Sequence, residues 1–188
     1  MKTTTLIFEP HQITFASSIP GQPVMHVMMD WEDSLMQAHA EIACHNQGDV
    51  LEVGFGMGIS STHIQNLNPT SHTIIEIHPD IFERAQLWAA DKPNVNLIFA
   101  DWHDCVDTLS TYDGIFFDTY ADLRAHEFIQ YVPQLIKPGG KFTWWNNTPA
   151  AENIYNDVDV EYTEYDVDPP ANTYFNANKY YLPVKIFG

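Results

Sequence analysis

The stretch Val50-Leu51-Glu52-Val53-Gly54-Phe55-Gly56-Met57-Gly58 decides the fold of this chain. It begins as an apolar strand and runs directly into a glycine-rich turn. A strand that ends in such a turn before a helix is how α/β proteins bring backbone N–H groups against a nucleotide-like ligand. The stretch therefore predicts a nucleoside-type cofactor and its location in the chain.

Strand and helix segments alternate after this turn, which predicts a doubly wound, Rossmann-like sheet that is mostly parallel. The expected strands cover residues 49–55, 73–77, 94–100, 114–118 and 141–145. The expected helices cover residues 30–45, 59–66, 79–90 and 123–135, with a short helix or turn at 105–109. Residues 158–167 and 180–187 are expected to form an antiparallel hairpin at the sheet edge.

We expect one domain over residues 1–188. It divides into an N-terminal arm (1–26), a cofactor-binding core (27–148) and C-terminal edge strands (149–188). In the expected helix that follows the arm, Asp30 is the predicted N-cap. Exposed edge strands would permit a homodimer.

The charge of the chain restricts its partners. The formal net charge is −17, from 25 acidic and 8 basic residues. Nucleic acid and anionic membrane surfaces are therefore disfavoured, whereas a cationic substrate is favoured. No apolar run is long enough to span a membrane, and the N-terminus lacks a signal-peptide core. Cys44 and Cys105 make no disulfide framework, so we expect a cytoplasmic protein.

Three features at strand ends indicate the cofactor. The turn is spaced Gly54-x-Gly56-x-Gly58, which departs from the dinucleotide pattern G-x-G-x-x-G. Glu76 ends the second strand, where a carboxylate can accept both ribose hydroxyls. Asp101 and Trp102 follow the third strand, where they could hold the amine and the face of adenine. Together these features favour S-adenosylmethionine over NAD.

Two further carboxylates accompany this set. Glu32 lies between Met28 and Met36 at a spacing of four, which places the three on one face of a helix or of its entry turn. Asp118 follows the apolar run Gly114-Ile115-Phe116-Phe117 and is expected at the mouth of the sheet, beside the cofactor. The histidines show no ligand spacing, so no metal site is expected.

These motifs resemble the guanidinoacetate N-methyltransferase family of class I S-adenosylmethionine-dependent methyltransferases. They also resemble the related fungal enzymes that methylate the inner nitrogen of protein arginine. The resemblance rests on residues 27–36, 50–58, 74–76 and 112–120 and covers roughly residues 24–148. It implies an N-methyltransferase that acts on a guanidino group.

The resemblance also implies site residues. It makes Glu32 and Asp118 the substrate pair, with Thr119, Thr148 and Pro149 as further substrate contacts. The implied cofactor contacts are Met28, Met36, Glu52, Gly54, Phe55, Gly56, Met57, Gly58, Ser60, Glu76, Ile77, Asp101, Trp102 and Asp118.

The chemistry of a guanidinium suits two carboxylates. It is a poor nucleophile, because it is protonated and its lone pairs are delocalised. Two carboxylates can hold it in forked hydrogen bonds and align one nitrogen with the sulfonium methyl. As the N–C bond forms, that nitrogen becomes acidic. Asp118 is then our first choice for the base, with Glu32 sharing or orienting.

The chain differs from the animal members of the family, which carry a lid tryptophan in a longer N-terminal arm. Here the residues before Val27 contain no tryptophan, and Phe8 or Phe15 could substitute. Tyr174 and Tyr180 have no role that the sequence assigns. The guanidine could be guanidinoacetate, an arginine-like metabolite or a peptide arginine. Another amine acceptor, or a cofactor-binding protein without transfer activity, are the alternatives.

Overall fold

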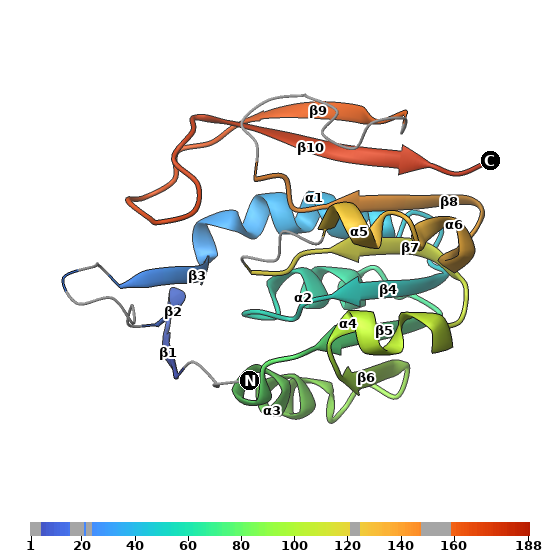
Figure 1. Cartoon of the computed structure of the whole chain (residues 1–188), viewed down its shortest axis with the longest axis horizontal. Helices are drawn as coiled ribbons and strands as arrows, with labels where there is room; N and C mark the ends of the chain where they lie inside the picture. Colours follow the sequence, from blue (N-terminus) through green and yellow to red (C-terminus); the bar gives the residue numbers. More distant parts are fainter. Residues whose placement is uncertain (1–4, 16–20, 22–23, 121–124, 148–158) are drawn as a thin grey trace.

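The computed structural model describes residues 5–15, 21, 24–120, 125–147 and 159–188. A seven-stranded sheet with the order β6-β5-β4-β7-β8-β10-β9 forms its centre (Figure 1). Strands β6, β5, β4, β7 and β8 pair in parallel, whereas β10 is antiparallel to both β8 and β9. In chain order the strands are β4 (Asp49–Val53), β5 (Ser71–Glu76), β6 (Val95–Phe99), β7 (Tyr112–Phe117), β8 (Ile136–Trp144), β9 (Glu161–Asp166) and β10 (Lys179–Ile186).

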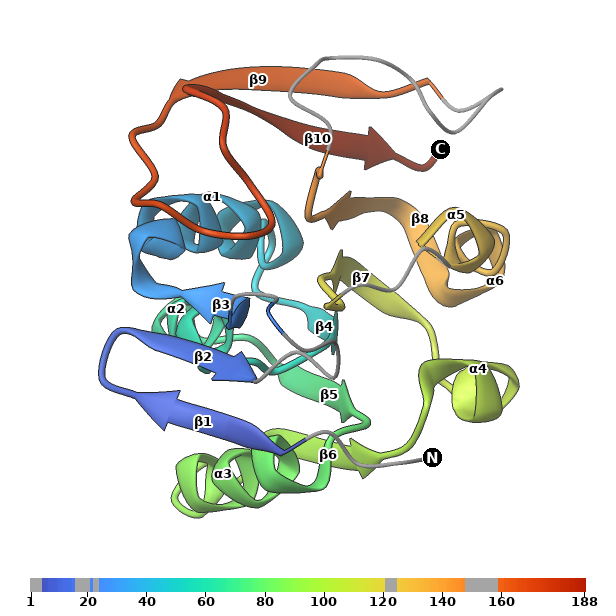
Figure 2. The ribbon, with the colours of Figure 1, turned by 60° about the vertical axis from the view of Figure 1, so that its left-hand side comes forward.

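The expected doubly wound sheet and its antiparallel edge hairpin are confirmed. Helices cover both faces, with α1, α2 and α3 on one side and α4, α5 and α6 on the other (Figure 2). The helices are α1 (Asp33–Ala43), α2 (Ile59–Asn66), α3 (Pro79–Ala89), α4 (Trp102–Cys105), α5 (Ala125–Phe128) and α6 (Val132–Leu135), with 3-10 turns η1 (Asp30–Glu32) and η2 (Val106–Thr108).

The central strands are buried on both faces, as parallel strands under two helical layers must be. In β4, Leu51 and Val53 pack with Ile115 of β7 and the rings of Phe128 and Phe142. On the other face, Val50 packs with residues of α1 and α2. This packing holds the carboxyl ends of β4, β5 and β7 level at one edge, because Val53 pairs with both Ile75 and Phe117.

A second, small antiparallel sheet lies beyond that edge (Figure 1). It consists of β1 (Leu6–Glu9), β2 (Gln12–Phe15) and β3 (Met25–Met29) in that order. The described part of the N-terminal arm thus forms short strands. The strand β3 was not expected, and it places Met28 on a strand instead of on the helix face that its spacing from Glu32 had suggested.

Several element bounds differ from the prediction. Asp30 is not the N-cap of α1. It begins η1, and its carboxylate binds His11 Nδ1 at 2.6 Å. The helix expected over residues 123–135 is two short helices, α5 and α6, in its described part. The strand expected over residues 141–145 begins earlier, at Ile136. Residues 137–140 form a bulge in it, where the pairing with β7 shifts register, and the Gly139 N–H donates to the carbonyl of Phe187 at 2.6 Å.

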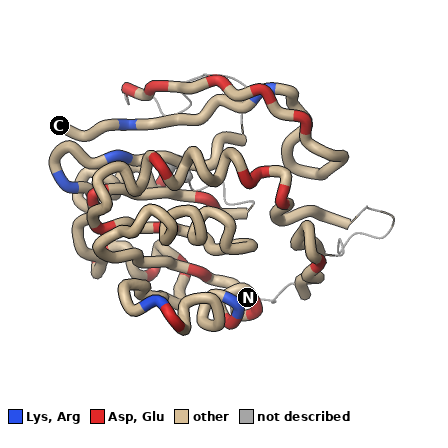
Figure 3. The backbone as a smooth tube through the Cα atoms, turned by 180° about the vertical axis from the view of Figure 1, so that it is seen from behind, with Lys and Arg blue, Asp and Glu red and all other residues tan. Residues whose placement is uncertain are grey.

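The charge distribution follows the topology. Acidic positions outnumber basic ones along the described backbone (Figure 3). Lys137 and Lys141 lie at the start of β8 and Lys185 near the end of the antiparallel β10, so all three lie at the edge opposite the carboxyl ends of the parallel strands. No helix in the described ranges is long and apolar enough to cross a membrane.

Candidate active site

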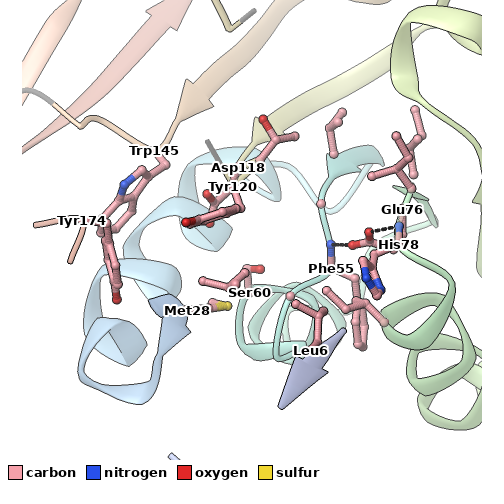
Figure 4. A pocket seen from close by; sticks show the side chains of 18 of the residues that line it. Leu6, Met28, Phe55, Ser60, Glu76, His78, Asp118, Tyr120, Trp145 and Tyr174 are labelled. Carbon is pink, nitrogen blue, oxygen red and sulfur yellow. Dashed lines mark hydrogen bonds between the residues drawn. The ribbon is translucent and has the colours of Figure 1, made fainter. Parts of the chain in front are cut away.

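A cavity of about 700 Å³ opens at the carboxyl ends of β4, β5, β6 and β7 (Figure 4). The small sheet covers part of it with Leu6, Phe15 and Met25. Open α/β sheets bind ligands at this edge. Eleven of the predicted site residues line it: Met28, Glu32, Gly54, Phe55, Gly56, Ser60, Glu76, Ile77, Trp102, Asp118 and Thr119.

Two glycines of the turn lie so close to neighbouring segments that a side chain would not fit there. Gly54 has φ +95°, and a Cβ there would lie 1.9 Å from the carbonyl oxygen of Asp118. Gly56 has φ +54°, and a Cβ there would lie 2.5 Å from Met28 Sδ. Both conformations favour glycine. The turn therefore brings β4, β7 and β3 together at the start of α2.

Glu76 forms the opposite wall to Trp145 and Tyr174 (Figure 4). It is buried, and its two oxygens accept the backbone N–H groups of Phe55 at 3.0 Å and of His78 at 2.7 Å. Burial raises the pKa of this carboxyl. The backbone of Ile77 also bonds this carboxylate, and the remaining lone-pair site of the carboxylate can accept a hydroxyl donor from a ribose, which fits the predicted cofactor.

Five predicted cofactor contacts are not among the residues that line the cavity. Glu52 is fully buried below the turn, where it accepts hydrogen bonds from the hydroxyls of Ser60 and Ser61 and contacts His72 Nε2 at 3.0 Å. These partners make it an anchor for the first turn of α2. Asp101 instead caps α4 by accepting the N–H of His103 at 3.1 Å. The others are Met36, Met57 and Gly58.

Met36 packs in the core with Val50, Ile64 and Phe116. Its spacing of four from Glu32 suggested a shared face. Glu32, however, belongs to the 3-10 turn η1 and Met36 to α1, so the two side chains do not follow one helical period. Trp102, in contrast, lines the cavity beside Ala100.

Glu32 is 3% exposed and lies at the cavity wall. Its Oε1 accepts the N–H of Met29 at 3.2 Å and the hydroxyl of Tyr174. Burial first, and the nearby Asp118 second, raise its pKa to about 8. A carboxylate so placed favours a cation beside it.

Asp118 follows β7, and its N–H bonds to the carbonyl of Val53 at 2.9 Å. Its side chain lines the cavity, and no described residue donates a hydrogen bond to it. Burial first, and Glu52 second, raise its pKa to about 7. The neighbouring Thr119 has a buried hydroxyl without a partner in the described ranges. Thr148 and Pro149 lie outside the described residues.

Sequence reasoning missed several lining residues, among them Tyr120, Trp145 and Tyr174, whereas Phe15 had been suggested as a substitute for the lid tryptophan. Phe15 and Tyr120 meet edge to face, with ring centroids 5.6 Å apart. Tyr174 comes from the loop between β9 and β10, which no local pattern connects to the glycine turn. Within the described residues, no group of three His, Cys, Asp or Glu side chains could hold a metal ion.

Comparison with known proteins agrees with this geometry. The family model described as guanidinoacetate N-methyltransferase matches residues 11–183. The chain is 32% identical over 174 residues to a Yarrowia lipolytica protein named protein arginine N-methyltransferase 2, which covers 85% of this chain and 35% of the relative. The Saccharomyces cerevisiae protein of the same name is 33% identical over 192 residues, which covers 84% of this chain and 46% of the relative. The chain thus spans less than half the length of these relatives.

Solved structures share the fold. Spermidine synthase from Thermotoga maritima superposes with a TM-score of 0.66 at 15% identity, over 98% of this chain and 72% of that one. A putative methyltransferase solved with SAH has a TM-score of 0.62 at 13% identity, over 98% of this chain and 56% of that one.

Proposed function

Since the chain belongs to the guanidinoacetate N-methyltransferase family, we propose that it transfers a methyl group to a guanidino nitrogen of a small cationic substrate. The cofactor is S-adenosylmethionine, as membership of this family establishes. When bound, it supplies a methyl group activated by a sulfonium. The lone pairs of Glu76 and the ring of Trp102 are positioned to hold its nucleoside part.

The observation that carries the proposal is the pair Glu32 and Asp118. Both carboxylates line one cavity and both have raised pKa values, about 8 and about 7. The described lining contains neither lysine nor arginine that could neutralise them. A guanidinium presents N–H donors along its edges and carries one positive charge. Its binding would therefore supply the cationic partner that the two carboxylates lack in the described lining.

The two carboxylates share the binding of the substrate, and one of them also takes its proton. Both bind the guanidinium and orient one nitrogen toward the methyl group, which supplies proximity. With the cofactor bound, this nitrogen would take the methyl group from the sulfonium, which would leave as a neutral thioether. The nitrogen then loses a proton, and Asp118 takes it, because its carboxylate has no donor among the described residues.

The names of the curated relatives favour a second candidate, an arginine side chain within a protein. The net charge of −17 suits either cation. A substrate panel separates the two candidates.

Incubation with methyl-labelled S-adenosylmethionine tests the proposal. The panel holds guanidinoacetate, free arginine, agmatine, an arginine peptide and a primary amine. We expect label in at least one small guanidine. Label in the peptide alone would select the second candidate, and label in no guanidine while the cofactor still binds would refute both.

Variants of the pair sharpen the test. Asp118→Asn should lower kcat by about 10²- to 10⁴-fold, the usual contribution of a general base, with cofactor affinity kept. Glu41→Gln, on the exposed face of α1, is a control that should leave activity unchanged. Full activity of Asp118→Asn would exclude Asp118 as the base.

A further inference from the structure

The loop between β9 and β10 reaches back to the small sheet and to α1 (Figure 2). Thr173 accepts the N–H of His26 on β3 at 2.8 Å. Within the loop, Asn172 Oδ1 accepts the N–H groups of Tyr174 at 2.9 Å and Phe175 at 2.7 Å. These bonds hold the backbone of Tyr174 at the cavity wall, although the loop belongs to the far edge of the sheet.

The hydroxyl of Tyr174 lies between two side chains of η1. Trp31 Nε1 donates to it at 3.0 Å, and it contacts Glu32 Oε1. An indole N–H only donates, and an ionised carboxylate only accepts. When Glu32 is ionised, the hydroxyl hydrogen must therefore point to it. The rings of Tyr174 and Trp31 are stacked, with centroids 6.4 Å apart, which fixes the hydroxyl in this position.

The two carboxylate oxygens of Glu32 therefore have different hydrogen-bond partners. Oε1 receives both the N–H of Met29 and the hydroxyl of Tyr174. No described residue donates to Oε2. The side chain is thus held by one oxygen, and the other is left for a ligand in the cavity.

We propose that Tyr174 is a positioning residue for guanidine binding: its hydroxyl holds Glu32 by Oε1, so that Oε2 is presented to the guanidinium. This inference rests on the proposed function. The tyrosine acts through Glu32 and takes no proton from the substrate.

The electrostatics of the site support the assignment. Burial and Asp118 raise the pKa of Glu32, whereas the hydrogen bond from Tyr174 lowers it. Tyr180 on β10 also interacts with Glu32, and Glu76 lines the opposite wall of the cavity. Without the hydroxyl, Glu32 should hold its proton to a higher pH and so lose its charge for the cation.

Tyr174→Phe tests this inference, because it removes the hydroxyl and keeps the ring stacked on Trp31. At neutral pH we expect KM for the guanidine to rise about 10- to 100-fold, the loss typical of a hydrogen bond to a charged group, with a smaller change in kcat. The defect should shrink as pH rises, because Glu32 then ionises without help. Cofactor affinity should not change.

Tyr181→Phe is the matched control. Tyr181 lies on the same hairpin and its hydroxyl bonds Glu164 at the surface. It should leave KM and the pH profile unchanged. In a Glu32→Gln background, Tyr174→Phe should add no further pH-dependent loss.

A ¹³C NMR titration of the Glu32 carboxyl provides a readout without any substrate. Its pKa should be higher in Tyr174→Phe than in the wild type. An unchanged Glu32 titration, or a KM defect that is constant across pH, would overturn the role of Tyr174. Wild-type protein that methylates no guanidine, with the Glu32 shift still present, would instead refute the proposed function alone.

Discussion

The carbonyl oxygen of Asp118 lies against the α-carbon of Gly54, so that a Cβ at this position would be 1.9 Å from the oxygen. The contact follows from the pairing of β4 with β7, in which Asp118 N–H also bonds the carbonyl of Val53. The turn at the cofactor site and the strand end that carries the proposed base are therefore joined by backbone. A substitution that displaces the glycine turn must therefore also displace the end of β7.

Gly54→Ala should consequently damage two properties at once. The added methyl must displace either the turn or the end of β7, and the residue also has to keep φ +95°. We expect loss of cofactor affinity and of methyl transfer, together with a lower midpoint of urea unfolding. Isothermal titration with S-adenosylmethionine measures the cofactor affinity.

The control for Gly54→Ala is Gly139→Ala. Gly139 has a similar φ of +79°, but a Cβ there would meet nothing within 4 Å. It should cost only the conformational strain, about 1–2 kcal/mol, and keep cofactor affinity. Equal cofactor affinity in both variants would show that the contact with Asp118 is unimportant.

The raised pKa of Glu32 predicts how stability depends on pH. The group titrates near 4.5 when unfolded and near 8 when folded, so the native state binds the extra proton between these values. Its contribution to stability is therefore complete below about pH 4.5 and is lost as pH rises through about 8. Glu32→Gln cannot ionise and should become more stable than the wild type at pH 9, but not at pH 4.

Thermal unfolding of the cofactor-free protein measures this difference, at roughly 2–4 °C for each kcal/mol in a chain of this size. The glutamine oxygen can still accept from Met29 and Tyr174, so packing is preserved. Glu41→Gln on the exposed face of α1 should show no pH-dependent difference in melting temperature from the wild type. A melting difference that is equal at both pH values would contradict the assigned pKa.

The sequence predicted correctly those elements whose boundaries are set by neighbouring residues in the chain. The helix Ile59–Asn66 was predicted with its observed bounds, because the glycine turn before it and the polar turn after it are contiguous in sequence. Glu52 shows the limit of this reasoning. A carboxylate two residues before Gly54 suits a cofactor contact as well as an anchor, and only the positions of Ser60, Ser61 and His72 decide for the anchor.

The rest of the site depends on contacts between distant segments. Glu32 and Asp118 were proposed from the family resemblance, and the fold brings both to one cavity. The partner of Glu32 was not predictable, because Tyr174 is 142 residues away and belongs to an irregular loop. The strand Met25–Met29 was missed for a related reason, since it is stabilised by pairing with β2.

A buried polar network behind the site should contribute to stability. Thr143 donates to the carbonyl of Pro183 at 2.6 Å, so it must accept from His39 Nδ1. His39 Nε2 then accepts from Tyr180, whose oxygen accepts the N–H of Asn146 at 2.9 Å. Burial lowers the pKa of His39 to about 3, so the ring is neutral.

Tyr180→Phe would leave His39 Nε2 buried without the donor that it has in the wild type, and it would remove the acceptor that Tyr180 offers to Asn146. A buried group that loses its partner costs about 1–3 kcal/mol, so urea unfolding should detect a clear loss of stability. Tyr181→Phe, next to it but with its hydroxyl at the surface, should cost much less. Equal losses in the two variants would refute the network.

Phe15 is the residue that we expect to close the cavity in place of the lid tryptophan of the animal enzymes. It lines the cavity and meets Tyr120 edge to face, whereas Phe8 packs under the guanidinium of Arg84 at 3.7 Å. An aromatic pair contributes about 0.5–1.5 kcal/mol beyond the area that it buries. Phe15→Ala should therefore weaken ligand binding by roughly 5- to 30-fold, which corresponds to a loss of about 1–2 kcal/mol.

Phe8→Ala is the matched comparison, since it removes the same ring from the same small sheet. It should affect the melting temperature more than the affinity, because Phe8 packs beside Ile81 and Ala85 of α3. Titration of both variants with S-adenosylmethionine and with the best guanidine measures the two affinities. If Phe8→Ala weakens binding and Phe15→Ala does not, the closing role belongs to β1, and the contact with Tyr120 has no part in it.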